Sequence, residues 1–163
     1  MMALNAYMRI TGESQGEIKG SVTQKGRRNT IMVIGFNHEV ISPRDIASGL
    51  PTGKRQHKSL MITKEIDKST PLLMSALVNN ENLTDVELLF WQPSKTGKEH
   101  NFFTIKLTNA SIAGIRQEML NNKYPENMQH KEREHISFCY QKIEWIYNKG
   151  GITAEDDWEA PVV

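Results

Sequence analysis

Apolar and polar side chains alternate along several short segments of the chain. A period of two is typical of strands that place one face against a core. In the segment 136–147 the apolar residues occupy even positions up to Tyr140 and odd positions from Ile143. This slip of phase at Gln141-Lys142 predicts a β-bulge. The alternating segments, each predicted to be a strand, are 3–10, 30–41, 60–66, 85–92, 101–108 and 136–147.

Helical periodicity is clearest at one place, directly after Ser69-Thr70-Pro71. A hydroxyl residue before a proline supplies a helix cap and a favourable first turn. Leucine and alanine then recur every three to four residues, which predicts a helix over 71–78.

The segment 42–58 shows neither the two-residue period of a strand nor the period of a helix. Pro43, Gly49, Pro51 and Gly53 exclude a long regular element, so we expect one long loop. Loops beyond about 12 to 15 residues are uncommon in compact domains and are usually functional or mobile. The segments 11–20 and 117–134 are also predicted to be connections.

Several short strands, long crossings and one helix favour an antiparallel sandwich or barrel. A parallel α/β sheet would need a helix at each crossover. With 163 residues the chain is close to the commonest domain size, so we expect a single domain, 1–163.

The charge balance argues against a nucleic-acid or membrane partner. Twenty Lys and Arg face 19 Asp and Glu, which leaves no strong field to attract the chain to phosphates. No window approaches the roughly 18 apolar residues of a membrane span, and the first ten residues do not resemble a targeting segment. We expect synthesis and folding in the cytoplasm, without membrane insertion.

The residues that carry catalysis or bind metals do not form a recognisable set. The five histidines are scattered, and the spacing of His130 and His135 does not place both on one helical face, so we expect no metal site. Cys139 lies in an apolar strand and is predicted to be a buried core residue. A hydrolase that used Cys139 with His135 or His130 would lack a third, orienting residue.

Three charged regions remain: the basic clusters 25–28 and 54–58, both weak signals of nucleic-acid binding, and the acidic tail. The basic cluster 54–58 has no interleaved aromatics for stacking bases, so solvated surface is the simpler reading, although its loop also suits an arm that reaches another subunit. The glycine spacing in 49–55 does not match a phosphate-binding loop. The tail is either solvated or a docking strip for such cations, and its acidic residues are Glu155, Asp156, Asp157 and Glu159.

Two consecutive stretches resemble a known family. Residues 51–58 read Pro-Thr-Gly-Lys-Arg-Gln-His-Lys, and residues 60–73 read Leu-Met-Ile-Thr-Lys-Glu-Ile-Asp-Lys-Ser-Thr-Pro-Leu-Leu. They resemble the haemolysin-coregulated protein (Hcp) family, the tube subunits of bacterial type VI secretion. The similarity extends to Met-Ala-Leu-Asn-Ala-Tyr at the start, Gly-Ser-Val-Thr from Gly20, Lys-Ile-Glu-Trp up to Trp145, and Asp157-Trp158.

The resemblance implies a mainly β fold: a two-sheet antiparallel β-barrel with one flanking helix and a long extended loop. Six copies are expected to form a ring, and rings to stack into a tube. The tube is expected to assemble in the cytoplasm and to leave through the secretion machinery without a signal peptide. Expected partners are the spike, baseplate and sheath proteins and small effectors in the lumen. Neither catalytic residues nor cofactors are expected.

The resemblance also assigns contact residues. The face of the second strand that ends in Asn37 and Glu39 is expected to line the lumen, unless it faces ordinary solvent, whereas Met32, Ile34 and Phe36 are assigned to the barrel core. A monomeric β-barrel that binds a small ligand in an internal pocket is the alternative function. The extended loop is expected to pack on a neighbouring subunit through Arg44, Asp45, Pro51, Thr52, Gly53, Lys54, Arg55, Gln56, His57 and Lys58.

Overall fold

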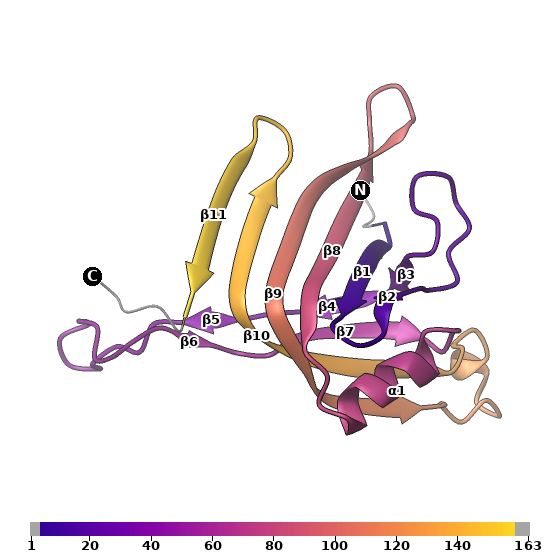
Figure 1. The fold of residues 1–163 in the computed structure, drawn as a ribbon, viewed down its shortest axis with the longest axis horizontal. Coiled ribbons are helices and arrows are strands. Elements are labelled where there is room, and N and C mark those ends of the chain that lie inside the picture. The colour runs from indigo at the N-terminus through magenta and orange to yellow at the C-terminus, as the bar shows by residue number, and fades with distance from the viewer. Residues whose placement is uncertain (1–3, 159–163) are drawn as a thin grey trace.

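The computed structural model describes residues 4–158. Within these residues, antiparallel strands make up most of the fold, and a single α-helix lies beside them (Figure 1). The strands are β1 (Ala6–Gly12), β2 (Gly16–Ile18), β3 (Ile31–Val33), β4 (Gly35–Asn37), β5 (Val40–Ile41), β6 (Gln56–His57), β7 (Leu60–Glu65), β8 (Leu83–Pro93), β9 (Glu99–Glu118), β10 (Arg133–Tyr147) and β11 (Ile152–Asp157); the helices are α1 (Thr70–Val78) and a 3-10 turn, η1 (Pro125–Asn127).

Nine strands of the described residues form one sheet. Its hydrogen-bonded order is β2-β1-β8-β9-β10-β7-β4, with β3 attached to β1 and β11 attached to β10. The long strands β9 and β10 bend along their length, so the sheet curls around its own inner face (Figure 1). The predicted mainly β, antiparallel fold with one helix is confirmed. The two predicted sheets, however, are parts of one curled sheet whose hydrogen bonding does not close.

The segment 31–37 changes partner midway. Its first part, β3, pairs with β1, and its second part, β4, pairs with β7. At the change of partner, the Ile34 amide donates to the Thr63 carbonyl oxygen at 2.8 Å. The segment 31–37 therefore connects β1 and β7, which lie near opposite ends of the strand order.

The burial pattern of this segment overturns one predicted face. Ile31 and Val33 are buried, whereas Ile34 and Phe36 are 44% and 41% exposed and Met32 is only partly buried. The assignment of Met32, Ile34 and Phe36 to the core is therefore wrong. The alternation is present but in the opposite phase, and because both faces of this segment carry apolar residues, the sequence does not show which one is buried.

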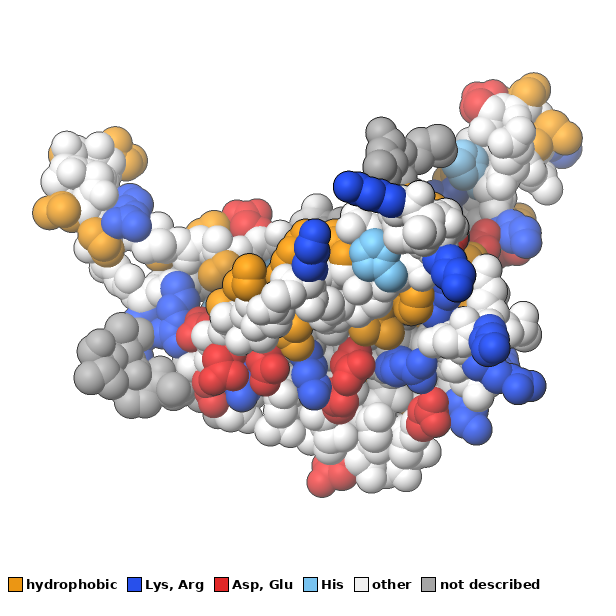
Figure 2. Space-filling model, turned by 90° about the horizontal axis from the view of Figure 1, so that it is seen from above, with side chains coloured by type: hydrophobic (Ala, Val, Ile, Leu, Met, Phe, Trp, Pro, Cys, Tyr) orange, Lys and Arg blue, Asp and Glu red, His pale blue; other side chains and the backbone are white. Residues whose placement is uncertain are grey.

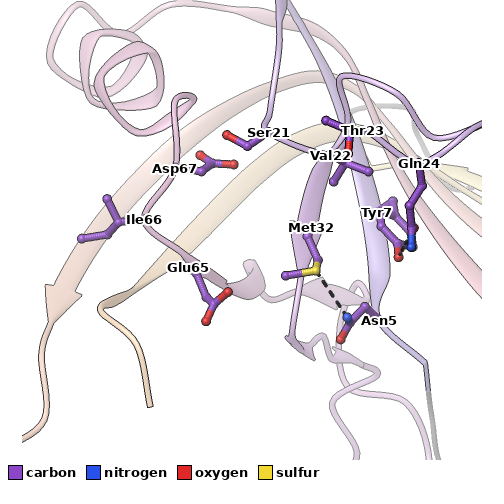
Figure 3. A pocket seen from close by; sticks show the side chains of 10 residues that line it. All are labelled: Asn5, Tyr7, Ser21, Val22, Thr23, Gln24, Met32, Glu65, Ile66 and Asp67. Atoms are coloured by element: carbon purple, nitrogen blue, oxygen red, sulfur yellow. Dashed lines mark hydrogen bonds between the residues drawn. The ribbon is translucent and has the colours of Figure 1, made fainter. Parts of the chain in front are cut away.

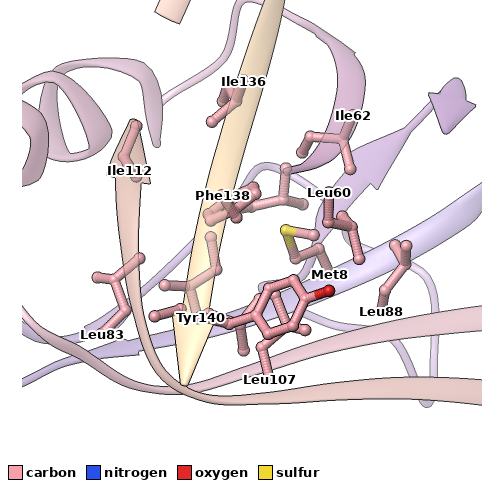
Figure 4. Close-up of a cluster of buried hydrophobic side chains, with 14 of the residues drawn as sticks. Met8, Leu60, Ile62, Leu83, Leu88, Leu107, Ile112, Ile136, Phe138 and Tyr140 are labelled. Atoms are coloured by element: carbon pink, nitrogen blue, oxygen red, sulfur yellow. The ribbon is translucent and has the colours of Figure 1, made fainter. Parts of the chain in front are cut away.

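The buried apolar residues form one cluster inside the curled sheet (Figure 4). Phe138 from β10 meets Met8 from β1 and Leu60 from β7 there, all with no more than 1% exposure. Burial of each such side chain contributes about 1.5–3 kcal/mol, so this cluster is the main source of stability.

The predicted slip of phase in β10 is present, but the bulge lies elsewhere. Tyr140 and Ile143 are both buried, so the inward face does change between them. The register with β9 is unbroken there and shifts instead between Ser137 and Phe138. Opposite the slip, Asn109 adopts a φ of 51°, a left-handed conformation that asparagine tolerates better than most residues.

The predicted helix is confirmed, with a different cap. Pro71 lies in its first turn, but the Ser69 side chain makes no capping bond. Instead, Asp67 Oδ1 accepts hydrogen bonds from the Ser69 amide, at 2.9 Å, and from its hydroxyl.

A buried ionic cluster fixes the start of the helix to the sheet. Lys64 Nζ and Glu134 Oε1 form an ion pair in which both side chains are at most 1% exposed. Thr70 Oγ1 donates to Glu134 Oε1 at 2.9 Å, and Asp67 Oδ1 lies 3.0 Å from Lys64 Nζ. Because each charge is paired and hydrogen-bonded, the cluster is compatible with burial.

Two predicted connections are shorter than expected. The segment 11–20 contains β2, and β9 and β10 extend into 117–134. The acidic tail is also structured, since β11 pairs with β10 along six residues. Glu159 lies outside the described residues. Polar residues on an outward-facing edge strand lack the apolar alternation that would have identified it.

Candidate functional site

The predicted loop 42–58 is a projecting two-stranded hairpin, and we call residues 40–57 the arm. Val40 pairs with His57 at its base, and an isolated bridge joins Arg44 and Pro51 near its end. The arm extends away from the body along the longest axis of the molecule (Figure 1). The predicted long extended loop is therefore present, with short strand pairing at its base and one isolated bridge near its end.

The end of the arm presents uncovered apolar side chains, which Figure 2 shows in orange at the projecting end. Ile46 is fully exposed and Leu50 is 64% exposed. In the same turn, Asp45 Oδ2 accepts hydrogen bonds from the Ser48 hydroxyl at 2.7 Å and the Ser48 amide at 3.0 Å, and these bonds lower the pKa of Asp45. The turn is thus internally braced while its apolar side chains remain uncovered.

The base of the arm is fastened to the last strand. The Arg55 guanidinium donates two hydrogen bonds to the Asp156 carboxylate, from Nε to Oδ2 at 2.7 Å and from Nη2 to Oδ1 at 2.8 Å. His57 Nε2 lies 2.6 Å from the same Oδ2. The Arg55 guanidinium, followed by the His57 imidazole, holds the pKa of Asp156 below its usual range.

Two histidines share one tyrosine hydroxyl behind this ion pair. Tyr140 Oη lies 2.8 Å from His57 Nδ1 and 2.7 Å from His38 Nε2. If both imidazoles are neutral, the carboxylate of Asp156 accepts from His57 Nε2–H. Tyr140 then donates to His57 Nδ1 and accepts from His38 Nε2–H.

Burial shifts the ionisation of this chain of groups. The pKa of His38 is lowered, first by burial and then by the nearby His57. The pKa of Tyr140 is raised, first by burial and then by the negative charge of Asp156. Both residues are therefore held in their neutral forms at neutral pH. The Trp158 indole also donates to the Tyr140 carbonyl, which adds one more bond between the tail and β10.

The structure separates the ten predicted contact residues into two groups. Arg55 and His57 are engaged within the chain, and the His57 side chain is only 1% exposed. The predicted attraction between loop cations and the acidic tail thus exists, but it joins two parts of one chain. The eight exposed members are Arg44, Asp45, Pro51, Thr52, Gly53, Lys54, Gln56 and Lys58.

The two residues expected at the lumen lie beside the base of the arm. Asn37 is exposed at the end of β4, opposite Met61 of β7. Glu39 is exposed in the following link, where its carbonyl oxygen accepts from the Lys58 amide at 3.0 Å. Both side chains are free to meet a ligand or a neighbouring chain.

Cys139 and His135, which were considered for catalysis, have different bonding partners. Cys139 is exposed, contrary to expectation, because the even positions of this part of β10 face the core. His135 bonds Thr63 Oγ1 and Glu118 Oε1, both at 2.9 Å. Among residues 4–158 no three His, Cys, Asp or Glu side chains are grouped to hold a metal, and no helix is long and apolar enough to span a membrane.

Sequence reasoning missed Tyr140 and Asp156 as parts of this site. Tyr140 was predicted only as an apolar position of a strand, and Asp156 was one of four acidic residues in the tail. The available signal was charge complementarity between the arm and the tail, which indicates attraction but not which residues meet.

Comparison with known proteins agrees with this fold. Residues 7–147 match the family model described as type VI secretion system effector, Hcp. The chain is 42% identical over 170 residues to the major exported protein of Pseudomonas aeruginosa, with 99% of each chain covered.

Solved structures agree as well. A crystal structure of an Hcp protein matches with a TM-score of 0.89 and 32% identity, covering 96% of this chain and 99% of the other. Secreted protein Hcp3 from Pseudomonas aeruginosa matches with a TM-score of 0.78 and 34% identity, with the same coverage. The chain therefore belongs to the Hcp family of type VI secretion proteins.

Proposed function

We propose that the chain is a structural subunit that assembles into six-membered rings, which stack into the tube of type VI secretion. The observation that supports this most directly is the arm, which exposes Ile46 and Leu50 at its far end. Exposed apolar side chains on a projecting, hydrogen-bonded hairpin do not stabilise the chain that carries them. They become stabilising when a second chain covers them.

The arm suits a ring in particular. It leaves one end of the body, so its contact surface differs from the surface that it meets on the next copy. Such head-to-tail contacts produce a closed ring when the rotation between copies closes. A stable contact usually buries about 800 Å² on each partner, and a projecting hairpin provides much of such an area.

Further parts of the proposal follow from family membership. Asn37 and Glu39 face the lumen, where they contact effector proteins carried by the ring. Assembly takes place in the cytoplasm, and the spike, baseplate and sheath proteins are the other partners. The subunit acts by assembly and is not an enzyme. The family match does not favour a monomeric ligand-binding module.

The test is to make the arm tip polar and measure assembly. The double substitution Ile46→Ser and Leu50→Ser removes the apolar tip and leaves Arg55 in place. We expect the unchanged protein to form rings under the electron microscope, and the double variant to remain largely monomeric in light scattering. The circular dichroism spectrum is expected to stay unchanged, because neither residue touches the core.

A matched control is Met128→Ser, since Met128 is 70% exposed but lies in the connection between β9 and β10. This variant is expected to keep its rings. A wild-type protein that remains monomeric from micromolar to millimolar concentration would refute the proposal. Rings that persist in the folded double variant would exclude the arm tip as the contact.

A further inference from the structure

We infer that a pocket at the end of the body away from the arm is the receptor for the arm tip of a second copy of this chain. The inference rests on the proposed function, and it names the surface that the arm meets. The pocket lies between β1, β3, the loop 19–30 and the residues that follow β7 (Figure 3). It encloses about 430 Å³.

The walls of the pocket combine apolar and acidic side chains. Val22, Met32 and Ile66 supply apolar surface, and Ile66 is 46% exposed. Glu65 and Asp67 lie along one side, and the described residues that line the pocket include no lysine or arginine. The pocket therefore favours an apolar side chain accompanied by a positive charge.

The two acids differ in their availability. Asp67 is already paired with the buried Lys64 at 3.0 Å and bonds the start of the helix. Glu65, in contrast, has no ion pair within residues 4–158. Glu65 is thus the carboxylate that remains available to a cation from outside.

The arm tip carries the matching features. Ile46 and Leu50 are exposed, and Arg44 is bridged to Pro51, the residue that follows Leu50. Within the described residues, the arm contains Arg44 and Lys54 without an ion pair, whereas Arg55 is bound to Asp156. The apolar tip of the arm therefore complements the apolar part of the pocket, and Arg44 complements Glu65.

The pocket is held in shape before any partner arrives. Tyr7 Oη donates to Gln24 Oε1 at 3.1 Å, which joins β1 to the loop 19–30. In the same loop, the Arg27 guanidinium lies over the rings of Tyr7 and Trp91, at 4.9 Å and 4.3 Å, and pairs with Glu99. A preformed pocket reduces the conformational entropy lost on binding.

The positions of arm and pocket fit a head-to-tail arrangement. The arm leaves one end of the molecule, and the strands that line the pocket lie toward the other end (Figure 1). Each copy thus offers a projection on one side and a receptor on the other, which is the requirement for a repeating heterologous contact.

The first experiment links the two surfaces covalently. In a Cys139→Ser background, which removes the native thiol, one variant carries Leu50→Cys and a second carries Ile66→Cys. The two are mixed and exposed to copper phenanthroline, which oxidises a pair of close thiols to a disulfide. We expect a disulfide-linked dimer that requires both variants. The control mixture replaces Ile66→Cys with Thr96→Cys, an exposed position on the β8–β9 turn, and is expected to yield none.

A charge exchange tests the same contact without oxidation. Arg44→Glu alone and Glu65→Lys alone are each expected to reduce the ring fraction several-fold in native mass spectrometry. Together they are expected to restore it, because the ion pair is reversed rather than removed. Lys95→Glu, on the β8–β9 turn, is the control and is expected to change nothing.

Ring measurements on the same samples separate the two proposals. Rings that form without linking at Ile66 and without charge rescue would overturn the receptor assignment and leave the pocket to another occupant, such as a small molecule or an effector peptide. A wild-type chain that forms no rings at all would overturn the proposed function together with this inference.

Discussion

Arg55 and Asp156 are joined by two parallel hydrogen bonds of 2.7 Å and 2.8 Å. This geometry fixes direction as well as distance, because a guanidinium and a carboxylate meet in one plane. Arg55 lies next to β6 of the arm, and Asp156 lies in β11, the last strand. The pair therefore determines how a projecting hairpin leaves the body.

Asp156→Asn is expected to loosen the arm without unfolding the domain. The amide keeps the shape of the carboxylate but cannot accept from both nitrogens of Arg55 and from His57. Hydrogen exchange of the Gln56 and His57 amides is expected to become several-fold faster in a ring-deficient background, and ring formation to weaken. The control is Glu155→Gln, next to it in β11, which pairs with Lys142 instead. Unchanged exchange in Asp156→Asn would show that the strand pairing alone holds the arm.

Acid is expected to weaken the pair between Arg55 and Asp156. Arg55 lowers the folded-state pKa of Asp156. The stabilisation by this carboxylate is therefore complete above its unfolded pKa of about 3.9 and is lost as pH falls through the lower folded value. The difference in unfolding free energy between wild type and Asp156→Asn should therefore shrink below about pH 4. Urea unfolding at a series of pH values measures it. A difference that grows in acid would contradict the assigned charge state.

His38 is expected to make the protein less stable in mild acid. Its folded-state pKa is lowered by burial and by His57, so the unfolded chain takes up a proton more readily. Stability is retained above the unfolded pKa of about 6.5 and falls as pH decreases below it, until the folded value is passed. His38→Gln should flatten this part of the urea-midpoint profile, whereas the exposed His100→Gln should not. Stability that rises between pH 7 and pH 5 would mean that this histidine is charged in the folded protein.

Glu134→Ala is expected to lower the free energy of unfolding strongly. It removes the main partner of the fully buried Lys64, and loss of one member of a buried pair costs about 3–5 kcal/mol. The lower end of that range is expected, because Asp67 stays 3.0 Å from Lys64. The double variant Lys64→Met and Glu134→Leu should lose less, since it leaves neither of these charges buried. Glu144→Gln, in a solvent-accessible pair with Lys142, should change the urea midpoint little.

The strands and the helix were predictable where one face meets the core. In β10 the side chains of Phe138 and Cys139 point to opposite sides, and the alternation indicates this directly. Cys139 was nevertheless predicted to be buried, because cysteine is usually a core residue and this expectation was given more weight than its place in the alternation. The phase of β10 was the better guide.

Local patterns indicated the long loop and an attraction between its cations and the acidic tail, but not the strand pairing within the arm or which residues meet. Hairpins with apolar exposed ends resemble loops in sequence, and the bond between Arg55 and Asp156 joins residues 101 positions apart. The change of partner at Ile34 was hidden for a similar reason, since pairing of β3 with β1 and of β4 with β7 depends on distant strands. Long-range pairing determines these features, whereas local periodicity reports only on the exposure of neighbouring residues.

The fastening also imposes an order in time. On the ribosome, Arg55 is synthesised long before Asp156, so the arm of a nascent chain has no carboxylate to hold it in direction. Only when the last strand has emerged and paired with β10 does the hairpin acquire its final orientation. In a growing chain the Arg55 guanidinium therefore has no Asp156 partner until β11 has been synthesised, and the direction of the arm is set late.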